Sequence, residues 1–392
     1  MEVIILFFSF FISCTHKEPT YIEEYCEDTS SISDTDFDLE TLSYSENIGS
    51  ISYYKMKLTF LGDIFWGRGI DRRAKKAKSP EKFPFEYLYE FQKQTKENWI
   101  ANLECPITKE TLPYESLVEK LKFYCDPRYL KEVEKYFDIF SLANNHTKNM
   151  EEYNGLEQTR TYLENHHIQF FGHYDNSTVD DICEIVDVLV EPIDTEGYPY
   201  VSIFEDDSLK VIPIALCGYH NVYRLPTQKE LDTIAKYSKY FITIVMPHQG
   251  EEYQIEENKW QRSVFRSMID RNADAVIGGH THSIQGLELY NGKPIAYSLG
   301  NFIFDQTFST DVRRGLIFSM NLTIPAEQDF IFAQSYLEHC REFKDSCWDL
   351  VSALNLPKLE YESSYDVQVR KMARLQTRKS TGTEEKQALK QA

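Results

Sequence analysis

Apolar runs alternate with stretches of helical periodicity from Met56 to about Tyr336. The runs are short and end in polar or glycine-containing turns, which predicts strands at residues 58–61, 99–103, 137–141, 168–171, 211–216, 241–246 and 275–277. Apolar residues at three-, four- and seven-residue steps predict helices at residues 153–167, 231–235 and 260–269. Asn291-Gly292 between two apolar runs predicts a hairpin. Strands that alternate with helices indicate an α/β fold, extended by a final β-rich segment.

The two ends of the chain differ from this middle part. The apolar run Val3–Ile12 is too short to span a bilayer and is typical of a secretory leader. Cys14 follows it directly, so we expect a lipoprotein-type signal peptide, residues 1–14, that ends at a lipidated Cys14. An ordinary cleaved signal and a misassigned start codon are the alternatives.

Four segments are expected along the chain. Residues 15–55 follow the leader as an acidic disordered tether, because 15–50 contain ten acidic residues and a single Lys. The folded domain is predicted at 56–340. Residues 341–392 form a C-terminal extension with a disordered tail from about Lys371.

Charge and cysteine content narrow the function classes. The 392-residue chain has 62 acidic and 42 basic residues and a net charge of −20, which disfavours nucleic acid as a partner and favours a divalent cation or a cationic partner. Its eight cysteines contain no Cys-x-x-Cys pair, so a structural zinc site of that kind is not expected. Their spacing does not indicate a disulfide framework, although Cys340 and Cys347 are able to pair.

Groups able to bind metal follow five of the predicted strands. They are Asp63, Glu104, Asn145 with His146, His248, and His280 with His282. Each alone has a simple alternative as a turn, a surface carboxylate, a helix cap or a core histidine. In α/β folds, however, ligands collect at the carboxyl ends of strands. This mixture of oxygen and nitrogen donors therefore predicts a divalent metal site for Mn, Zn or Fe, with one or two ions.

Six blocks around these residues resemble one protein family. In chain order they are Leu61–Arg68, Ala101–Pro106, Ser141–His146, His248–Tyr253, Gly279–Gly286 and Tyr297–Asp305. Over roughly residues 57–320 the chain resembles the CapA family of bacterial poly-γ-glutamate capsule biosynthesis proteins, a branch of the calcineurin-like metallophosphoesterases. The resemblance implies a four-layered α/β/β/α sandwich around a metal centre.

The resemblance also implies roles for individual residues. Metal ligands are expected at Asp63, Glu104, Asn145, His248, His280 and His282. His146 is expected to be the acid or electrostatic partner of the leaving group, and Arg68 to face the substrate as a second catalytic group. Asn102, Glu252, Tyr253 and Asn301 are the remaining substrate-binding candidates.

Three departures concern the metals. Two are from the wider superfamily and belong to the branch, and one is from the branch itself. Phe65 stands where metallophosphoesterases carry a histidine, Glu104 stands where they carry an aspartate, and residues 147–150 lack an aspartate that the branch commonly has. One of the two metal positions is therefore short of ligands, so both a one-ion and a two-ion centre stay open.

The sequence predicts a lipid-anchored, metal-dependent hydrolase or transferase outside the cytoplasm, at the membrane or cell surface. Its substrate would be an anionic polymer or a phosphoester, and capsule-synthase subunits in the membrane would be possible partners. A non-catalytic component that holds the polymer, and a scaffold with an unused domain, remain alternatives. Among cationic residues near the motifs, only Arg68, with Arg313 and Arg314, is expected to meet a polyanion.

Overall fold

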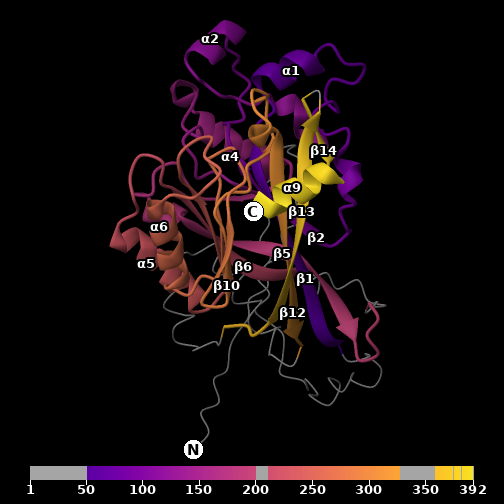
Figure 1. Ribbon diagram of the computed structural model, residues 1–392, viewed down its shortest axis with the longest axis vertical. Helices are drawn as coiled ribbons and strands as arrows, with labels where there is room; N and C mark the ends of the chain where they lie inside the picture. Colours follow the sequence, from indigo (N-terminus) through magenta and orange to yellow (C-terminus); the bar gives the residue numbers. More distant parts are fainter. Residues whose placement is uncertain (1–50, 200–210, 327–357, 374, 381, 392) are drawn as a thin grey trace, which may run out of the picture. The chain divides into compact units, whose positions relative to one another are not determined.

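The computed structural model describes residues 51–199, 211–326, 358–373, 375–380 and 382–391. Their fold is α/β, as expected, with fourteen connected strands and helices on both outer faces (Figure 1). The predicted leader with Cys14, the tether up to residue 50, and Cys340 and Cys347 lie outside these residues. Within the described part of the chain, no helix is both long and apolar enough to cross a membrane.

Strand β1 (Ile51–Ile64) organises the first sheet. Parallel strands continue from one side of it, namely β2 (Glu97–Leu103), β3 (Ile139–Ser141) and β4 (Gln169–Phe171). Its other side pairs with β11 (Asn301–Ile303) and antiparallel β12 (Arg314–Pro325). Because β1 begins at Ile51, residues 51–55 belong to the sheet and not to the predicted tether.

The second sheet starts from β5 (Cys183–Asp194), which pairs with β1 at one end and with β6 (Val211–His220) at the other. Beyond β6 the order is β7 (Thr243–His248), β8 (Ala275–Ile277), β10 (Lys293–Ala296) and β9 (Leu287–Tyr290). Strands β6, β7, β8 and β10 are parallel. β9 and β10 form the hairpin predicted from Asn291-Gly292.

The helices are short. The α-helices are α1 (Arg68–Ala74), α2 (Tyr114–Glu119), α3 (Leu130–Val133), α4 (Gly155–Asn165), α5 (Gln228–Ser238), α6 (Lys259–Ile269) and α9 (Thr383–Gln391). Single 3₁₀ turns occur at Leu88–Phe91, Pro127–Tyr129, Glu151–Tyr153, Val179–Asp181 and Asp311–Arg313. Capping boxes begin α5 at Thr227 and α6 at Asn258, which fixes where these two helices leave the second sheet.

Alternation of side chains along the strands produces the four layers. Phe60 of β1 and Ile244 of β7 belong to one buried cluster, which lies between the two sheets. Trp99 of β2 faces the other way, into a cluster with α1, α3 and α4. Val245 of β7 likewise faces away, into a cluster with α5 and α6. Since successive residues of a strand point to opposite faces, these three clusters define the predicted α/β/β/α order.

Two features correct the sequence predictions. The C-terminal tail is not frayed in its described part. Strand β13 (Glu362–Ala373) pairs with β12 over ten residues, and β14 (Gln376–Lys379) and α9 follow it (Figure 1). Val369 of β13 is completely buried in the core between the sheets. The second correction is that two disulfides are present, Cys105–Cys125 and Cys183–Cys217. Both join loops or strands far apart in the chain, which a spacing rule does not detect.

Candidate metal centre

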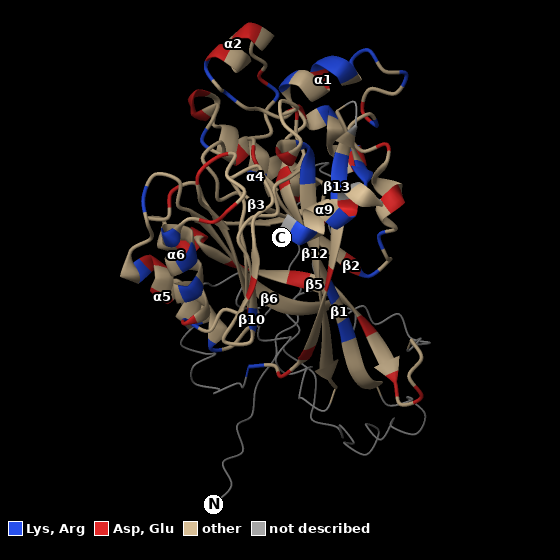
Figure 2. Cartoon of the chain, in the orientation of Figure 1, with Lys and Arg blue, Asp and Glu red and all other residues tan. Residues whose placement is uncertain are grey.

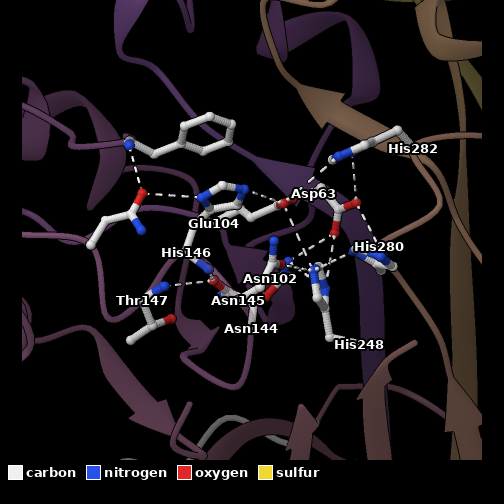
Figure 3. Close-up of polar contacts among 12 residues, drawn as sticks. Asp63, Asn102, Glu104, Asn144, Asn145, His146, Thr147, His248, His280 and His282 are labelled. Atoms are coloured by element: carbon white, nitrogen blue, oxygen red, sulfur yellow. Dashed lines mark hydrogen bonds and ion pairs between the residues drawn. The ribbon is translucent and has the colours of Figure 1, made fainter. Parts of the chain in front are cut away.

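The predicted ligands meet at the carboxyl ends of the parallel strands. Asp63 lies at the end of β1, Glu104 directly follows β2, and His248 is the last residue of β7. A bridge pairs His248 with Gly279, which brings the loop after β8 beside the end of β7. The parallel pairing of β1, β2 and β3 aligns their ends in the same way, so residues distant in sequence converge at one edge. Figure 3 shows the resulting cluster.

A chain of amide hydrogen bonds holds the aspartate. Asn144 donates to the carbonyl oxygen of Leu103 (2.8 Å) and to Asn102 Oδ1 (3.0 Å), which fixes the orientation of the Asn102 amide. Asn102 Nδ2 therefore faces Asp63 Oδ1 at 2.8 Å and His248 Nδ1 at 3.2 Å. All four side chains are buried. Asn102 thus contacts Asp63 and His248, and its role in substrate binding stays a prediction.

Asn145 and His280 contact the other ring nitrogen of His248. Asn145 Oδ1 lies 2.9 Å from His248 Nε2, and His280 Nδ1 lies 3.2 Å from the same nitrogen (Figure 3). The backbone amide of His280 donates to Asp63 Oδ2 at 3.3 Å. Burial, and then neighbouring imidazoles, hold the pKa values of His248 and His280 well below the usual range. Both rings are therefore neutral, which is the form that binds a metal.

Glu104 is the most informative residue of the cluster. It is fully buried, and neither of its oxygens has a hydrogen-bond partner within the described residues. Its Oε1 lies 3.7 Å from His248 Nε2 and 3.8 Å from His282 Nε2. Ligand atoms of Asp63, Glu104 and His282 all lie within 4.8 Å of one another. A buried carboxylate without a partner is costly, and a cation among these atoms would remove that cost. The donor set therefore fits a divalent ion.

The pKa values of Glu104 and His282 also indicate a place for a cation. Burial raises the pKa of Glu104 well above its usual value, and Asp63 adds to the effect. Burial alone would lower the pKa of His282, but the carboxylates of Glu104 and Asp63 raise it to about 9. Without a cation, Glu104 and His282 thus retain a proton between them near neutral pH. A divalent ion would take the place of that proton.

His146 lies at the edge of the cluster, with Nε2 3.9 Å from Glu104 Oε1. Asn149 Oδ1 accepts from the Phe123 amide (2.7 Å) and lies 3.1 Å from His146 Nδ1. Since this amide oxygen is an acceptor, Nδ1 carries the proton and Nε2 is left as an acceptor that faces the cluster. Burial lowers the pKa of His146 to about 3. Asn149 stands in the stretch where the branch commonly has an aspartate.

Arg68 and the aromatic rings form one wall of the site. The ring of Phe123 stacks on His146 with centroids 3.6 Å apart, and Phe65 stacks on Phe123 from the other side. The Arg68 guanidinium lies over both phenylalanines and makes two hydrogen bonds to Asp305, at 3.2 and 2.5 Å. Asp305 holds Arg68 at the rim, so the arginine neutralises part of the acidic centre without entering it.

The other three predicted substrate residues lie beside His282. Asn301 Oδ1 is 2.9 Å from His282 Nδ1, and Asn301 is buried, so it orients the imidazole. Tyr253 stacks on His282 and is 42% exposed, and Glu252 is exposed next to it. Of the three, only Glu252 and Tyr253 are open to a ligand.

The backbone at the site is strained. His280, His282, Arg68 and Tyr253 have positive φ angles of 91°, 57°, 41° and 65°. Residues other than glycine rarely adopt this region, and such strain is concentrated at functional sites. The loop after β8 places its two imidazoles toward the cluster through these conformations.

The structure therefore brings together all six predicted ligands, with His146 and Arg68 at the rim. Sequence reasoning missed Asn144, Asn149 and Asp305, which orient the neighbouring groups. It also missed His220, which is paired with His248 across β6 and β7. His220 follows a predicted strand just as His248 does, so the same strand-end criterion applies to it.

Comparison with known proteins identifies a family with these motifs. The model of the family "Bacterial capsule synthesis protein PGA_cap" matches residues 57–306. The chain belongs to this family. The match runs from the middle of β1 to Gln306 and includes all six predicted ligands.

Two curated relatives have a similar extent. "PGA biosynthesis protein CapA" of Bacillus subtilis (strain 168) is 27% identical over 267 residues, which cover 67% of this chain and 65% of the relative. "Capsule biosynthesis protein CapA" of Bacillus anthracis is 26% identical over 259 residues, which cover 64% of this chain and 60% of the relative. The chain thus spans less than two thirds of the length of these relatives.

One solved structure, the crystal structure of TT1561 of Thermus thermophilus, matches 68% of this chain and 94% of its own length. The identity is 9% and the TM-score is 0.35, so this similarity supports no further inference.

Proposed function

We propose that this family member acts in the biosynthesis of a capsule or related exopolymer, such as poly-γ-glutamate, as a metal-dependent hydrolase or transferase of the metallophosphoesterase type. The observation that carries the proposal is the buried carboxylate of Glu104, which has no hydrogen-bond partner within the described residues and lies among Asp63, His248 and His282. The names of the two Bacillus relatives supply the biological context.

The surrounding residues are suited to group transfer. Asp63, Glu104, Asn145 and the three imidazoles would hold the divalent ion, which would supply electrophilic polarisation and make water more nucleophilic at neutral pH. The neutral His146 presents Nε2 as a proton acceptor beside the same carboxylate. Arg68 supplies positive charge for an anionic group of the substrate, which is either a phosphoester or a carboxylate polymer.

The protein would work outside the cytoplasm, attached to the membrane through Cys14 and associated with capsule-synthase subunits. The two disulfides support this location, since such bonds persist in oxidising compartments. Radiolabelled palmitate that is incorporated by the native chain but not by a Cys14→Ala variant would test the anchor. Equal labelling of both would exclude this anchor.

Loss of one imidazole tests the activity. His280→Ala should release the metal, measured by elemental analysis of the purified full chain, and abolish hydrolysis of a phosphoester or of the amide bonds of poly-γ-glutamate. His167→Ala is a matched control, because His167 is exposed and also has a positive φ angle, 55°. If the native chain binds no metal and His280→Ala has unchanged activity in both assays, the proposal is wrong.

A second candidate is a non-catalytic component that holds the polymer through the ion and Arg68. Phe65 favours it, because a stacked, fully buried ring occupies the position of a superfamily ligand. Capsule formation in cells separates the two candidates. If metal-ligand variants support normal capsule formation, the second candidate is favoured, and if they do not, the first is.

A further inference from the structure

A dense basic segment begins at Arg68 and was not recognised in the sequence. Residues 68–82 contain seven Lys or Arg and only two acidic residues, in a chain of net charge −20. They cover α1 and the turns that follow it, and Figure 2 shows the concentration of basic residues over α1. We call residues 68–82 the basic segment.

Most of its charges are unpaired. The six basic side chains beyond Arg68 are exposed. Lys75 pairs with Asp71, which also binds Arg128. No ion pair joins the other five to a carboxylate of the described residues, and these five are Arg72, Arg73, Lys76, Lys78 and Lys82. Like charges held this close repel one another. An anionic ligand would neutralise this local excess of positive charge and remove the repulsion.

The basic segment begins beside the metal centre. Its first residue, Arg68, lies over Phe123, which stacks on His146. A cavity of about 130 Å³ extends from Arg68 along α1 and is lined by Arg72 and Tyr114, and also by Asp71 and Asp126, whose carboxylates both pair with Arg128. The Arg72 guanidinium lies 4.4 Å above the Tyr114 ring, which positions it at the cavity.

We propose that the basic segment is a binding site for a linear polycarboxylate, which it guides past Arg68 toward the metal centre. The charges follow a helix of seven residues, about 10 Å long, and then the exposed turns, so they suit repeated anionic groups better than one compact anion. The cavity has room for a single carboxylate side chain. The identity of the polymer rests on the proposed function, whereas the site itself rests on charge and geometry.

An anionic membrane surface is the main competing ligand. Val118 and Leu121, on or next to α2, are exposed and would suit insertion into lipid. The polymer is favoured because the cavity beside Arg68 and Arg72 offers a recess next to the basic segment, which a flat bilayer does not enter.

The test measures binding of the full chain to fluorescein-labelled poly-γ-glutamate by anisotropy at several salt concentrations. In the triple variant Arg73→Gln, Lys76→Gln, Lys78→Gln, we expect affinity at low salt to fall roughly tenfold or more and to depend less on salt. The control removes three exposed lysines near or on α5 and α6, through Lys229→Gln, Lys239→Gln and Lys259→Gln, and should change affinity less than about twofold.

Two further arms separate the alternatives. His280→Ala should still bind the polymer at low salt, so failure of the catalytic proposal leaves this one standing. Vesicles of phosphatidylcholine and phosphatidylserine in equal parts should bind the triple variant and the control alike. Equal polymer binding by the triple variant and the control would overturn the proposal, as would vesicle binding that is lost only in the triple variant.

Discussion

The ring of Phe65 stacks on the ring of Phe123, with centroids 4.5 Å apart and planes inclined by 16°. Both rings are buried, and Phe123 in turn covers His146. A buried apolar ring without a donor atom thus occupies position 65, where, by the resemblance in sequence, metallophosphoesterases carry a histidine. This substitution bears on how many ions the remaining donors would serve.

We therefore expect one divalent ion per chain. Asp63, Glu104 and His282 provide one compact group, and Phe65 adds no donor atom. Elemental analysis after metal loading and gel filtration would measure the ratio. Phe65→Leu should keep the same ratio while losing about 1 kcal/mol of stability with the stacking contact. A ratio of two in the native chain would contradict this prediction.

Glu104→Gln should have opposite effects on stability and on metal affinity. The raised pKa of Glu104 means that its contribution to stability is greatest at low pH and is lost as pH rises through the folded-state pKa. In chelator at pH 9, the neutral amide should therefore stabilise the protein by roughly 1–2 kcal/mol. Thermal unfolding would measure this.

The same variant should bind metal at least about tenfold more weakly, because an anionic ligand is lost. Titration of metal-depleted protein gives the comparison. If the chelated variant is less stable than the native chain at pH 9, Glu104 has stabilising partners and the reasoning fails.

His282 should make the metal-free protein sensitive to alkaline pH. Its pKa of about 9 is higher than the ordinary 6.5, so its stabilisation is complete below pH 6.5 and is lost as pH rises through 9. The loss is at most about 3 kcal/mol. Unfolding temperatures in chelator from pH 6 to 10 should fall accordingly, and His282→Gln should flatten the curve. Added metal should reverse the trend, because it binds the neutral imidazole.

The disulfide Cys105–Cys125 should stabilise both the fold and the aromatic wall. It closes a loop of 20 residues. A disulfide across a loop of this length adds about 3 kcal/mol to the free energy of unfolding. Cys105 follows Glu104 and Cys125 lies two residues after Phe123, so its loss should also loosen the wall that carries His146. Changing both cysteines to Ser should lower the urea midpoint and the activity together.

The second disulfide serves as the comparison. Changing Cys183 and Cys217 to Ser removes a bond between β5 and β6, away from the aromatic wall. It should lower the urea midpoint and affect activity less. Peptide mapping that finds free thiols at both Cys105 and Cys125 in exported protein would contradict the prediction.

Much of the site follows from local sequence pattern. The strand before each candidate ligand is a short apolar run. Apolar runs of this length form buried strands whatever their position in the sheet. Asp63, Glu104 and His248 were identified because each lies where such a run ends. The Asn291-Gly292 hairpin was likewise predictable, since its backbone conformation is a property of those two residues.

Other features depend on contacts between distant segments. Strand β13 was missed because it is polar on its exposed face, and only pairing with β12 makes a strand of it. The two disulfides depend on which loops approach each other. The amide chain from Asn144 through Asn102 to Asp63 likewise exists only once β1, β2 and β3 are aligned.

The sequence by itself determined the α/β class, the strand ends and the kinds of ligand offered there, because these depend on neighbouring residues along the chain. Only the tertiary structure decided that Glu104 is buried without a hydrogen-bond partner beside Asp63 and His282, and that Arg68 lies over the ring that stacks on His146. Strand register and long-range packing set these distances, and neither is encoded in any one segment.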